Sequence, residues 1–475
     1  MKIDTLVRGG HLFTMSGDGV GYVADGSVAI DRGKIEAVGP WSELAREYTG
    51  EEVIDARNHA ILPGLIDAHM HTRLAILRGL AQDTRNWMLY GVGPFAPHVG
   101  DAAGDAGSRL AVVEALRSGT TTFGDYGPGM DATCRFLERT GVRAQVTGLI
   151  REVPPDMSAL APGELYTFDP AIGERTLQEN LDLYERWHRA GDGRFTVLFG
   201  PQGPDFLSKE LLLKVRKMAI ERGTRVHVHT AQGDRETIQI EGRYGTRPIA
   251  FLDAIGYLDG HLLAVHLTDA TEEEAALVAR RGASLVLCSG SIGIIDGVVP
   301  PARAFADAGG AVALGSDQAP GNNCHNMWSE MKLTALFNKI RAADPEVFPA
   351  WRVLRMATVD GARALGLDGS IGSLEPGKRA DLITVDLRRP SIAPLYTDPM
   401  RNIVPNLVYS ARGEEVDTVL VDGRTLVSGG RVLTADVAFI VAEAQRHAGE
   451  IGEAATEAFS LAGGPNAAWM REGKL

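Results

Sequence analysis

The sequence predicts an α/β protein: a (β/α)8 TIM barrel with a small β-sandwich domain formed from both chain ends. Between residues 61 and 366, short apolar strand candidates alternate with helical segments, a pattern typical of parallel sheets with helical crossovers. Brief apolar runs separated by Gly and Asp recur at both ends of the chain, where they could pair into one small domain. An open doubly wound sheet is the structural alternative.

The two ends of the chain and the tail are assigned to structural elements from their residue patterns. Residues 1–60 form the N-terminal part of the predicted β-sandwich, with a turn at Asp31-Arg32-Gly33 between two apolar runs. Residues 367–433 show the same pattern of brief apolar runs and turns, and they are predicted to form the C-terminal part of the β-sandwich. Residues 434–475 are rich in Ala and Glu and predict a helical tail.

Eight strand candidates lie in the central region, as a closed barrel requires. They are residues 62–67, 120–124, 144–149, 195–199, 225–229, 262–266, 284–288 and 311–315. Helical patterns such as 106–117 and 176–190 separate several of them. The stretch 82–107 is too long for a plain loop and predicts a lid or a substrate wall.

Histidine and aspartate gather at the carboxyl ends of four of these strands. His69 and His71 end the first strand, and residues two apart in a strand share a face, so both imidazoles should face the barrel interior. Barrel active sites are built at this end of the strands. The other three strands end in His227, His229, His266 and Asp317. Nitrogen and carboxylate ligands together suit a divalent ion such as zinc.

Composition narrows the classes of partner. The net charge of −13 argues against a nucleic-acid surface, which needs clustered Lys and Arg. No signal peptide and no apolar run of membrane-spanning length is evident, so no membrane partner is expected. The three cysteines are scattered without a C-x-x-C pair, which favours a reduced cytoplasm. We expect a small-molecule substrate and a homo-oligomer, a dimer or larger.

The motifs, taken together, resemble the amidohydrolase superfamily, in particular its branch of cytosine and guanine deaminases and triazine hydrolases (chlorohydrolases). The resemblance covers about residues 1–430. The segments that carry it are Pro63–His71, Ser118–Thr122, His229–Ala231, His266–Asp269, Ala313–Asp317, Gly321–Lys332 and Gly372–Leu382.

The resemblance implies an enzyme, a metal-dependent hydrolase of carbon–nitrogen bonds other than peptide bonds. His69, His71, His229 and Asp317 would be the metal ligands, and His266 would touch the metal-bound water or complete the coordination. Asp317 would take the water's proton and deliver it to the leaving group. Residues 199–204 lack the bridging lysine of binuclear members, so one divalent ion is expected, with zinc preferred over Fe, Mn or Co.

One catalytic position departs from the deaminase pattern. The deaminases carry a glutamate three residues after the strand-five histidine, and here that residue is Gln232, which cannot relay a proton as a carboxylate does. An aromatic ring needs protonation before attack, whereas a urea or carbamate carbonyl needs only polarisation. The apolar segment Cys288–Ile295 also departs from the family and indicates a less polar pocket.

We therefore predict hydrolysis of a C–N or C–S bond in an N-substituted urea, carbamate or thiocarbamate, as in xenobiotic degradation, by a metal-bound hydroxide. The alternative is a deaminase or dechlorinase of a triazine, pterin, purine or pyrimidine. A metal-free, non-catalytic barrel related to dihydropyrimidinases and an iron oxygenase are rival classes.

Substrate contacts are predicted in the loops at the rim of the barrel. Aromatic and polar residues in the rim loops could line the pocket, but they could equally belong to the core. The predicted contacts are Trp87, Tyr90, Phe95, Gln202, Phe206 and Asn322. His227 is interpreted as a histidine behind the metal ligands or in the core, and His325 as a packing residue that could approach the substrate.

Overall fold

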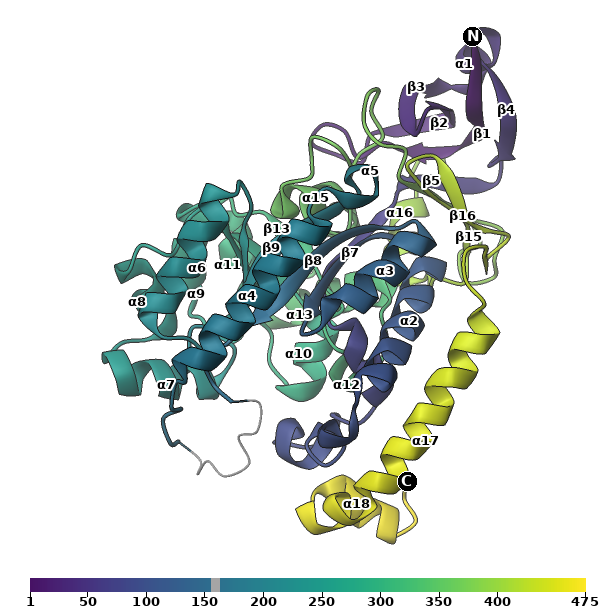
Figure 1. Ribbon diagram of the computed structural model, residues 1–475. Coiled ribbons are helices and arrows are strands. Elements are labelled where there is room, and N and C mark those ends of the chain that lie inside the picture. The colour runs from purple at the N-terminus through teal and green to yellow at the C-terminus, as the bar shows by residue number, and fades with distance from the viewer. Residues whose placement is uncertain (155–162) are drawn as a thin grey trace.

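The computed structural model describes residues 1–154 and 163–475. Within these residues the strands form two sheets, one parallel and barrel-like and one built from both ends of the chain (Figure 1). The predicted fold class is therefore confirmed.

The barrel strands follow one another around the parallel sheet in chain order. The eight found in the described chain are Leu65–Met70 (β6), Thr120–Gly127 (β7), Arg143–Ile150 (β8), Phe195–Pro201 (β9), Val226–Thr230 (β10), Leu262–His266 (β11), Ser284–Leu287 (β12) and Val312–Leu314 (β13). A bridge between Met70 and Asp317 joins the last strand region to the first. Each predicted barrel strand overlaps one of these, although residues 62 and 63 belong to the other sheet.

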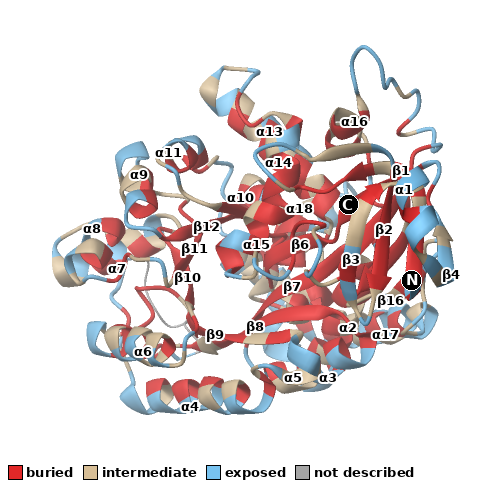
Figure 2. Ribbon diagram, turned by 90° about the horizontal axis from the view of Figure 1, so that it is seen from above, coloured by how far each residue is buried: buried red, intermediate tan, exposed pale blue. Residues whose placement is uncertain are grey.

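Helices cover the outside of the barrel, and the buried strands lie inside them (Figure 2). Apolar residues occupy both faces of the strands, as a parallel sheet covered on both sides requires. The helices are Asp101–Arg117 (α2), Met130–Thr140 (α3), Pro170–Trp187 (α4), Ala190–Gly193 (α5), Lys209–Glu221 (α6), Asp234–Tyr244 (α7), Pro248–Ala254 (α8), Glu272–Arg280 (α9), Ser289–Ile295 (α10), Ala302–Asp307 (α11), Ala319–Asn322 (α12), Met327–Ala342 (α13), Ala350–Met356 (α14), Val359–Leu365 (α15) and Ile403–Tyr409 (α16).

The second sheet joins the two ends of the chain. Its N-terminal strands are Lys2–Phe13 (β1), Tyr22–Asp31 (β2), Lys34–Pro40 (β3), Thr49–Asp55 (β4) and His59–Pro63 (β5), with helix Trp41–Glu47 (α1) between β3 and β4. Its C-terminal strands are Leu382–Asp386 (β14), Val416–Val421 (β15), Arg424–Ser428 (β16) and Arg431–Val432 (β17). β5 pairs with β1 on one side and with β14 on the other, so it connects the two halves.

The C-terminal helices support the barrel rim. Val437–Ala462 (α17) runs beside α2 and reaches the short helical turns Thr72–Leu77 (η1), Trp87–Val92 (η2) and Ala96–His98 (η3) (Figure 1). Pro465–Arg471 (α18) also contacts η2. Across the part of the chain that the structure describes, no helix has the length and apolar character needed to cross a membrane.

Candidate active site

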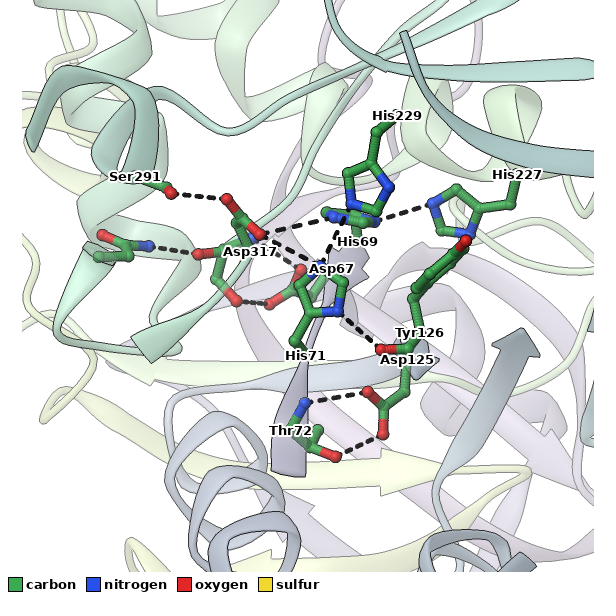
Figure 3. A network of polar contacts seen from close by, with 12 residues as sticks. Asp67, His69, His71, Thr72, Asp125, Tyr126, His227, His229, Ser291 and Asp317 are labelled. Carbon is green, nitrogen blue, oxygen red and sulfur yellow. Dashed lines mark hydrogen bonds and ion pairs between the residues drawn. The ribbon is translucent and has the colours of Figure 1, made fainter. Parts of the chain in front are cut away.

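Four imidazoles and one carboxylate converge at the carboxyl ends of the barrel strands. His69 lies in β6 and His71 follows it, His229 lies in β10, His266 ends β11, and Asp317 follows β13. The Nε2 atoms of His69 and His71 lie 3.6 and 3.4 Å from Oδ1 of Asp317 (Figure 3). The structure thus brings together all five residues that the sequence predicted for the metal and its water.

Two of the histidines are oriented by backbone carbonyl groups. Nδ1 of His71 lies 2.7 Å from the carbonyl oxygen of Tyr126, and Nδ1 of His229 lies 2.7 Å from that of Gln202. Because a carbonyl oxygen only accepts, each Nδ1 carries a proton, and Nε2 is the nitrogen left to bind a cation. These two Nε2 atoms lie 3.3 Å apart, an arrangement that a shared cation would stabilise.

His69 is the third nitrogen donor and is fully buried. Its Nδ1 lies 2.9 Å from Nε2 of His227, and Nδ1 of His227 lies 3.1 Å from the hydroxyl oxygen of Thr147. Burial lowers the pKa of His69 to about 4 and that of His227 well below its ordinary value, so both rings are neutral near pH 7.

His266 is buried against the rings of His69 and His229. Neither of its ring nitrogens has a hydrogen-bond partner among the described residues. Burial lowers the pKa of His266 to about 3, which keeps the ring neutral. Its φ of +79° is uncommon for a residue with a side chain, and such backbone strain gathers at functional sites. This ring is free to bind a metal or a substrate oxygen.

Asp317 is the charged partner of the imidazoles. Burial acts to raise its pKa, but the surrounding histidines outweigh burial and hold the pKa well below the usual carboxyl range. The hydroxyl of Ser291 donates to Oδ2 of Asp317 at 2.5 Å, which leaves Oδ1 for the histidine side. Sequence reasoning missed Ser291, although it lies in the segment singled out for departing from the family.

A second layer of buried carboxyl groups lies behind Asp317. The side chain of Asp67 accepts hydrogen bonds from the backbone and the hydroxyl of Ser316. The amide of Asn322 donates to the carbonyl of Ser316 at 2.7 Å and to Glu330 at 2.8 Å. Burial raises the pKa of Asp67 to about 7 and that of Glu330 to about 8. This network supports the turn that carries Asp317.

The donor set fits a divalent metal ion. His69, His71 and Asp317 place ligand atoms within 4.8 Å of one another, as do His69, His229 and His266. Nε2 of His69 is buried and has no hydrogen-bond partner among the described residues. Imidazole nitrogens with one carboxylate oxygen are the ligands of catalytic zinc sites.

Gln232 lies in the loop after β10, where its backbone is held by Glu236. The carboxyl oxygens of Glu236 accept from the backbone N–H groups of Ala231 and Gln232, each at 2.9 Å. Ala231 has a φ of +50°, so these two bonds stabilise a left-handed turn. The half-buried Gln232 side chain therefore extends from a loop with a defined backbone.

Two predicted substrate contacts are enclosed by protein. Phe206 is fully buried, with Tyr166 stacked on it at 5.5 Å and Arg235 over its ring at 4.7 Å. The amide of Asn322 is occupied by the two bonds to Ser316 and Glu330. Asn322 thus supports the turn that carries Asp317, and its contact with substrate stays a prediction.

The remaining predicted contacts lie at the rim. Gln202 uses its carbonyl to orient His229, while its buried side-chain oxygen has no hydrogen-bond partner in the described chain. The ring of Phe95 packs on Phe459 of α17 at 5.5 Å, and Tyr90 lies against Gly464 beside α18. Trp87 is half-buried at the start of η2. Their contact with substrate stays a prediction.

His325 is a buried packing residue. Its Nδ1 lies 2.7 Å from the hydroxyl of Ser316, and its backbone N–H donates to Glu114. It belongs to the supporting network.

Glu330, Tyr126 and Thr147 were not predicted to take part in the site, and the carbonyl of Tyr126 has no sequence signal that could reveal its role.

Known enzymes resemble this chain along most of its length. The model of the amidohydrolase family matches residues 60–426. The 5-methylthioadenosine/S-adenosylhomocysteine deaminase of Moorella thermoacetica is 36% identical over 89% of this chain and 94% of its own length. The 5'-deoxyadenosine deaminase of Methanosarcina mazei is 31% identical over 94% of this chain and 98% of its own length.

A solved structure is similar throughout. The adenosine deaminase from Xanthomonas campestris, solved with bound zinc, has a TM-score of 0.86 and 29% identity, covering 95% of this chain and 99% of that one. The family match spans the barrel and reaches into the second sheet on both sides. The chain belongs to the amidohydrolase family and is a metal-dependent hydrolase of carbon–nitrogen bonds other than peptide bonds.

Proposed function

We propose that this enzyme is a hydrolytic deaminase of adenosine-type substrates, releasing ammonia from the 6-amino group of a purine nucleoside. The observation that carries the proposal is the buried constellation of His69, His71, His229, His266 and Asp317, in a chain that aligns with a 5-methylthioadenosine/S-adenosylhomocysteine deaminase over most of its length. These relatives favour the deaminase alternative of the sequence analysis over its urea and carbamate reading.

The proposal includes one zinc ion held by the three histidine Nε2 atoms and Asp317. When bound, such an ion lowers the pKa of a water molecule towards neutrality and makes it a nucleophile. The cation would also separate the lone pairs of His71 and His229, which otherwise face each other at 3.3 Å. A single ion remains the expectation because residues 199–204, at the end of β9, contain no lysine.

Asp317 is the proposed general base and acid. It is ionised at neutral pH, and Ser291 holds its Oδ2 so that Oδ1 faces the histidines. The carboxylate can take a proton from the attacking water and pass it to the departing amine. His266 is neutral and has no hydrogen-bond partner among the described residues, so its N–H can donate to the oxygen that gains negative charge at the reacting carbon.

Gln232 supports a second candidate. Its amide can donate a hydrogen bond to a ring nitrogen but cannot transfer a proton, so deamination of a purine lacks one aid at this position. Hydrolysis of an N-substituted urea, carbamate or thiocarbamate does not need that proton. The second candidate rests on this residue, whereas the first rests on the relatives and the metal constellation.

One substrate panel tests both candidates. Purified zinc-loaded enzyme is incubated with adenosine, 5'-deoxyadenosine, 5'-methylthioadenosine and S-adenosylhomocysteine, and separately with a phenylurea, an aryl carbamate and a thiocarbamate. Ammonia release with formation of the inosine-type product supports deamination. Cleavage of the second set alone supports the second candidate, and turnover of neither set by metal-loaded protein overturns both.

A further inference from the structure

We infer that His227 and Thr147 form a hydrogen-bonded relay that fixes the tautomer of His69 and so positions one metal ligand. The inference rests on the metal site of the proposed function but not on its substrate. His69 differs from His71 and His229 because a second imidazole, rather than a backbone carbonyl, contacts its Nδ1 (Figure 3).

The protons along this chain can be assigned from its metal end, because the Thr147 hydroxyl can either donate or accept. Nε2 of His69 faces Asp317 and the other ligands, so it must keep its lone pair to bind a cation, and the proton lies on Nδ1. That N–H then donates to Nε2 of His227 at 2.9 Å. Nε2 of His227 is therefore an acceptor, and the N–H at its Nδ1 donates to the hydroxyl of Thr147 at 3.1 Å.

The surrounding packing holds the His227 ring in this orientation. The ring of Tyr126 stands edge-on to it with centroids 5.1 Å apart, and the ring of His69 does so at 4.9 Å. The methyl group of Thr147 lies against Gly200. A Cβ atom added to this glycine would be only 2.5 Å from that methyl group. This contact directs the methyl group to Gly200 and leaves the hydroxyl group for His227.

Loss of the Thr147 hydroxyl would allow His227 to change its tautomer. Without an acceptor at Nδ1, His227 is better satisfied with its proton on Nε2, which then donates to His69. His69 must in turn carry its proton on Nε2, where it opposes metal binding. Thr147 lies on β8 and is not one of the candidate metal ligands, and its hydroxyl contacts the site through His227.

The test measures metal binding in the full chain with Zn²⁺ or Co²⁺ as the probe and no substrate. Each metal-free variant is titrated against a chelator of known affinity, and the visible spectrum of bound Co²⁺ reports the ligand geometry. Two matched pairs are compared: His227→Met with His227→Gln, whose side-chain oxygen replaces the Nε2 acceptor, and Thr147→Val with Thr147→Ser, which keeps the hydroxyl.

We expect His227→Met to weaken Zn²⁺ binding by about 10- to 100-fold, the usual range for partners that orient a ligand. Thr147→Val should weaken it by roughly 10-fold, while His227→Gln and Thr147→Ser stay within a few-fold of wild type. Equal losses within each pair, or no loss in either non-polar variant, overturn the relay. If His227→Met does not fold, the Thr147 pair decides.

The outcome is separable from that of the proposed function. A wild-type chain that binds neither metal refutes the metal centre itself. A wild-type chain that binds metal while Thr147→Val binds it equally well refutes only the relay. A change in the Co²⁺ spectrum of Thr147→Val without a change in unfolding temperature supports positioning rather than general destabilisation.

Discussion

The histidine side and the carboxylate side of the metal centre are held in different ways. On the histidine side, three of the four rings receive one orienting contact each: a backbone carbonyl for His71 and for His229, and His227 for His69. On the carboxylate side, Asp317 lies on a turn whose neighbour Ser316 is bound to both Asp67 and Asn322.

The difference shows where the site is vulnerable to substitution. A carbonyl oxygen cannot be removed by a side-chain change, so the orientation of His71 and His229 survives most substitutions. The carboxylate side depends on buried polar groups that satisfy one another, and loss of one leaves its partners unpaired. We expect changes on the histidine side to alter metal binding and changes behind Asp317 to alter folding stability.

The largest effect should follow from Asp317→Asn, which removes the charge where the two sides meet. The amide keeps the shape but cannot accept a proton, so kcat should fall by about 10³-fold or more. Turnover is compared at equal metal content, determined by elemental analysis of each protein. A rate within 10-fold of wild type would exclude Asp317 as the proton carrier.

A gain is expected on the histidine side from Gln232→Glu. A carboxyl group after β10 can protonate a purine ring nitrogen, so kcat/KM for adenosine-type substrates should rise by about 10- to 100-fold. Cleavage of ureas should not rise. Gln232→Met, which fills similar volume without a polar group, is the control. A rise for neither substrate class shows that a proton at this position does not limit the reaction.

On the carboxylate side, Asn322→Ala should disrupt the hydrogen-bond network behind Asp317. This change leaves the carbonyl of Ser316 and the buried Glu330 without their amide partner and should cost about 1–3 kcal/mol of unfolding free energy. Urea unfolding of the metal-free protein measures it. Gln178→Ala on the exposed face of α4 removes a surface amide and serves as the control. Equal stability of the two variants would contradict the network's structural role.

A change in pH should act on folding stability through Glu330. Burial raises the folded pKa of Glu330 to about 8 from 4.5, so between these values the folded state keeps a proton that the unfolded state has lost. Stability should therefore fall as pH rises from 6 towards 8, by at most about 1.4 kcal/mol per pH unit from this group, and should level off above its folded pKa.

Thermal unfolding at several pH values measures this slope, and Glu330→Gln should flatten it. The comparison is made on metal-free protein, because a bound cation would also act on these carboxyl groups. A slope in Glu330→Gln as steep as in wild type would assign the titration to another buried carboxyl, such as Asp67.

The sequence was sufficient to predict the barrel and the clustering of the candidate ligands, because both depend on local patterns. Strand alternation places His69 and His71 on one face, and the strand ends deliver His229, His266 and Asp317 to one rim. The groups that orient these candidate ligands could not be predicted from local patterns. The carbonyl of Tyr126 belongs to a backbone group present in every residue, and its role exists only after the strands are adjacent.

The rim was the hardest region to predict. Trp87, Tyr90 and Phe95 were assigned to a substrate wall by composition, but the last two pack on residues near the C-terminus, more than three hundred and sixty positions later in the chain. No periodicity links such distant segments. The C-terminal helices, expected only as a helical tail, are thus a support for the barrel mouth.

The pairing of β5 with β14 also constrains the order in which the protein can be made. During synthesis β1 to β5 leave the ribosome long before β14 to β17. The edge of β5 that pairs with β14 therefore stays unpaired while the whole barrel is synthesised. Early termination anywhere before residue 382 would leave that edge exposed and prone to pair with another chain. Nascent copies are thus most exposed to aggregation during the interval between these two strands.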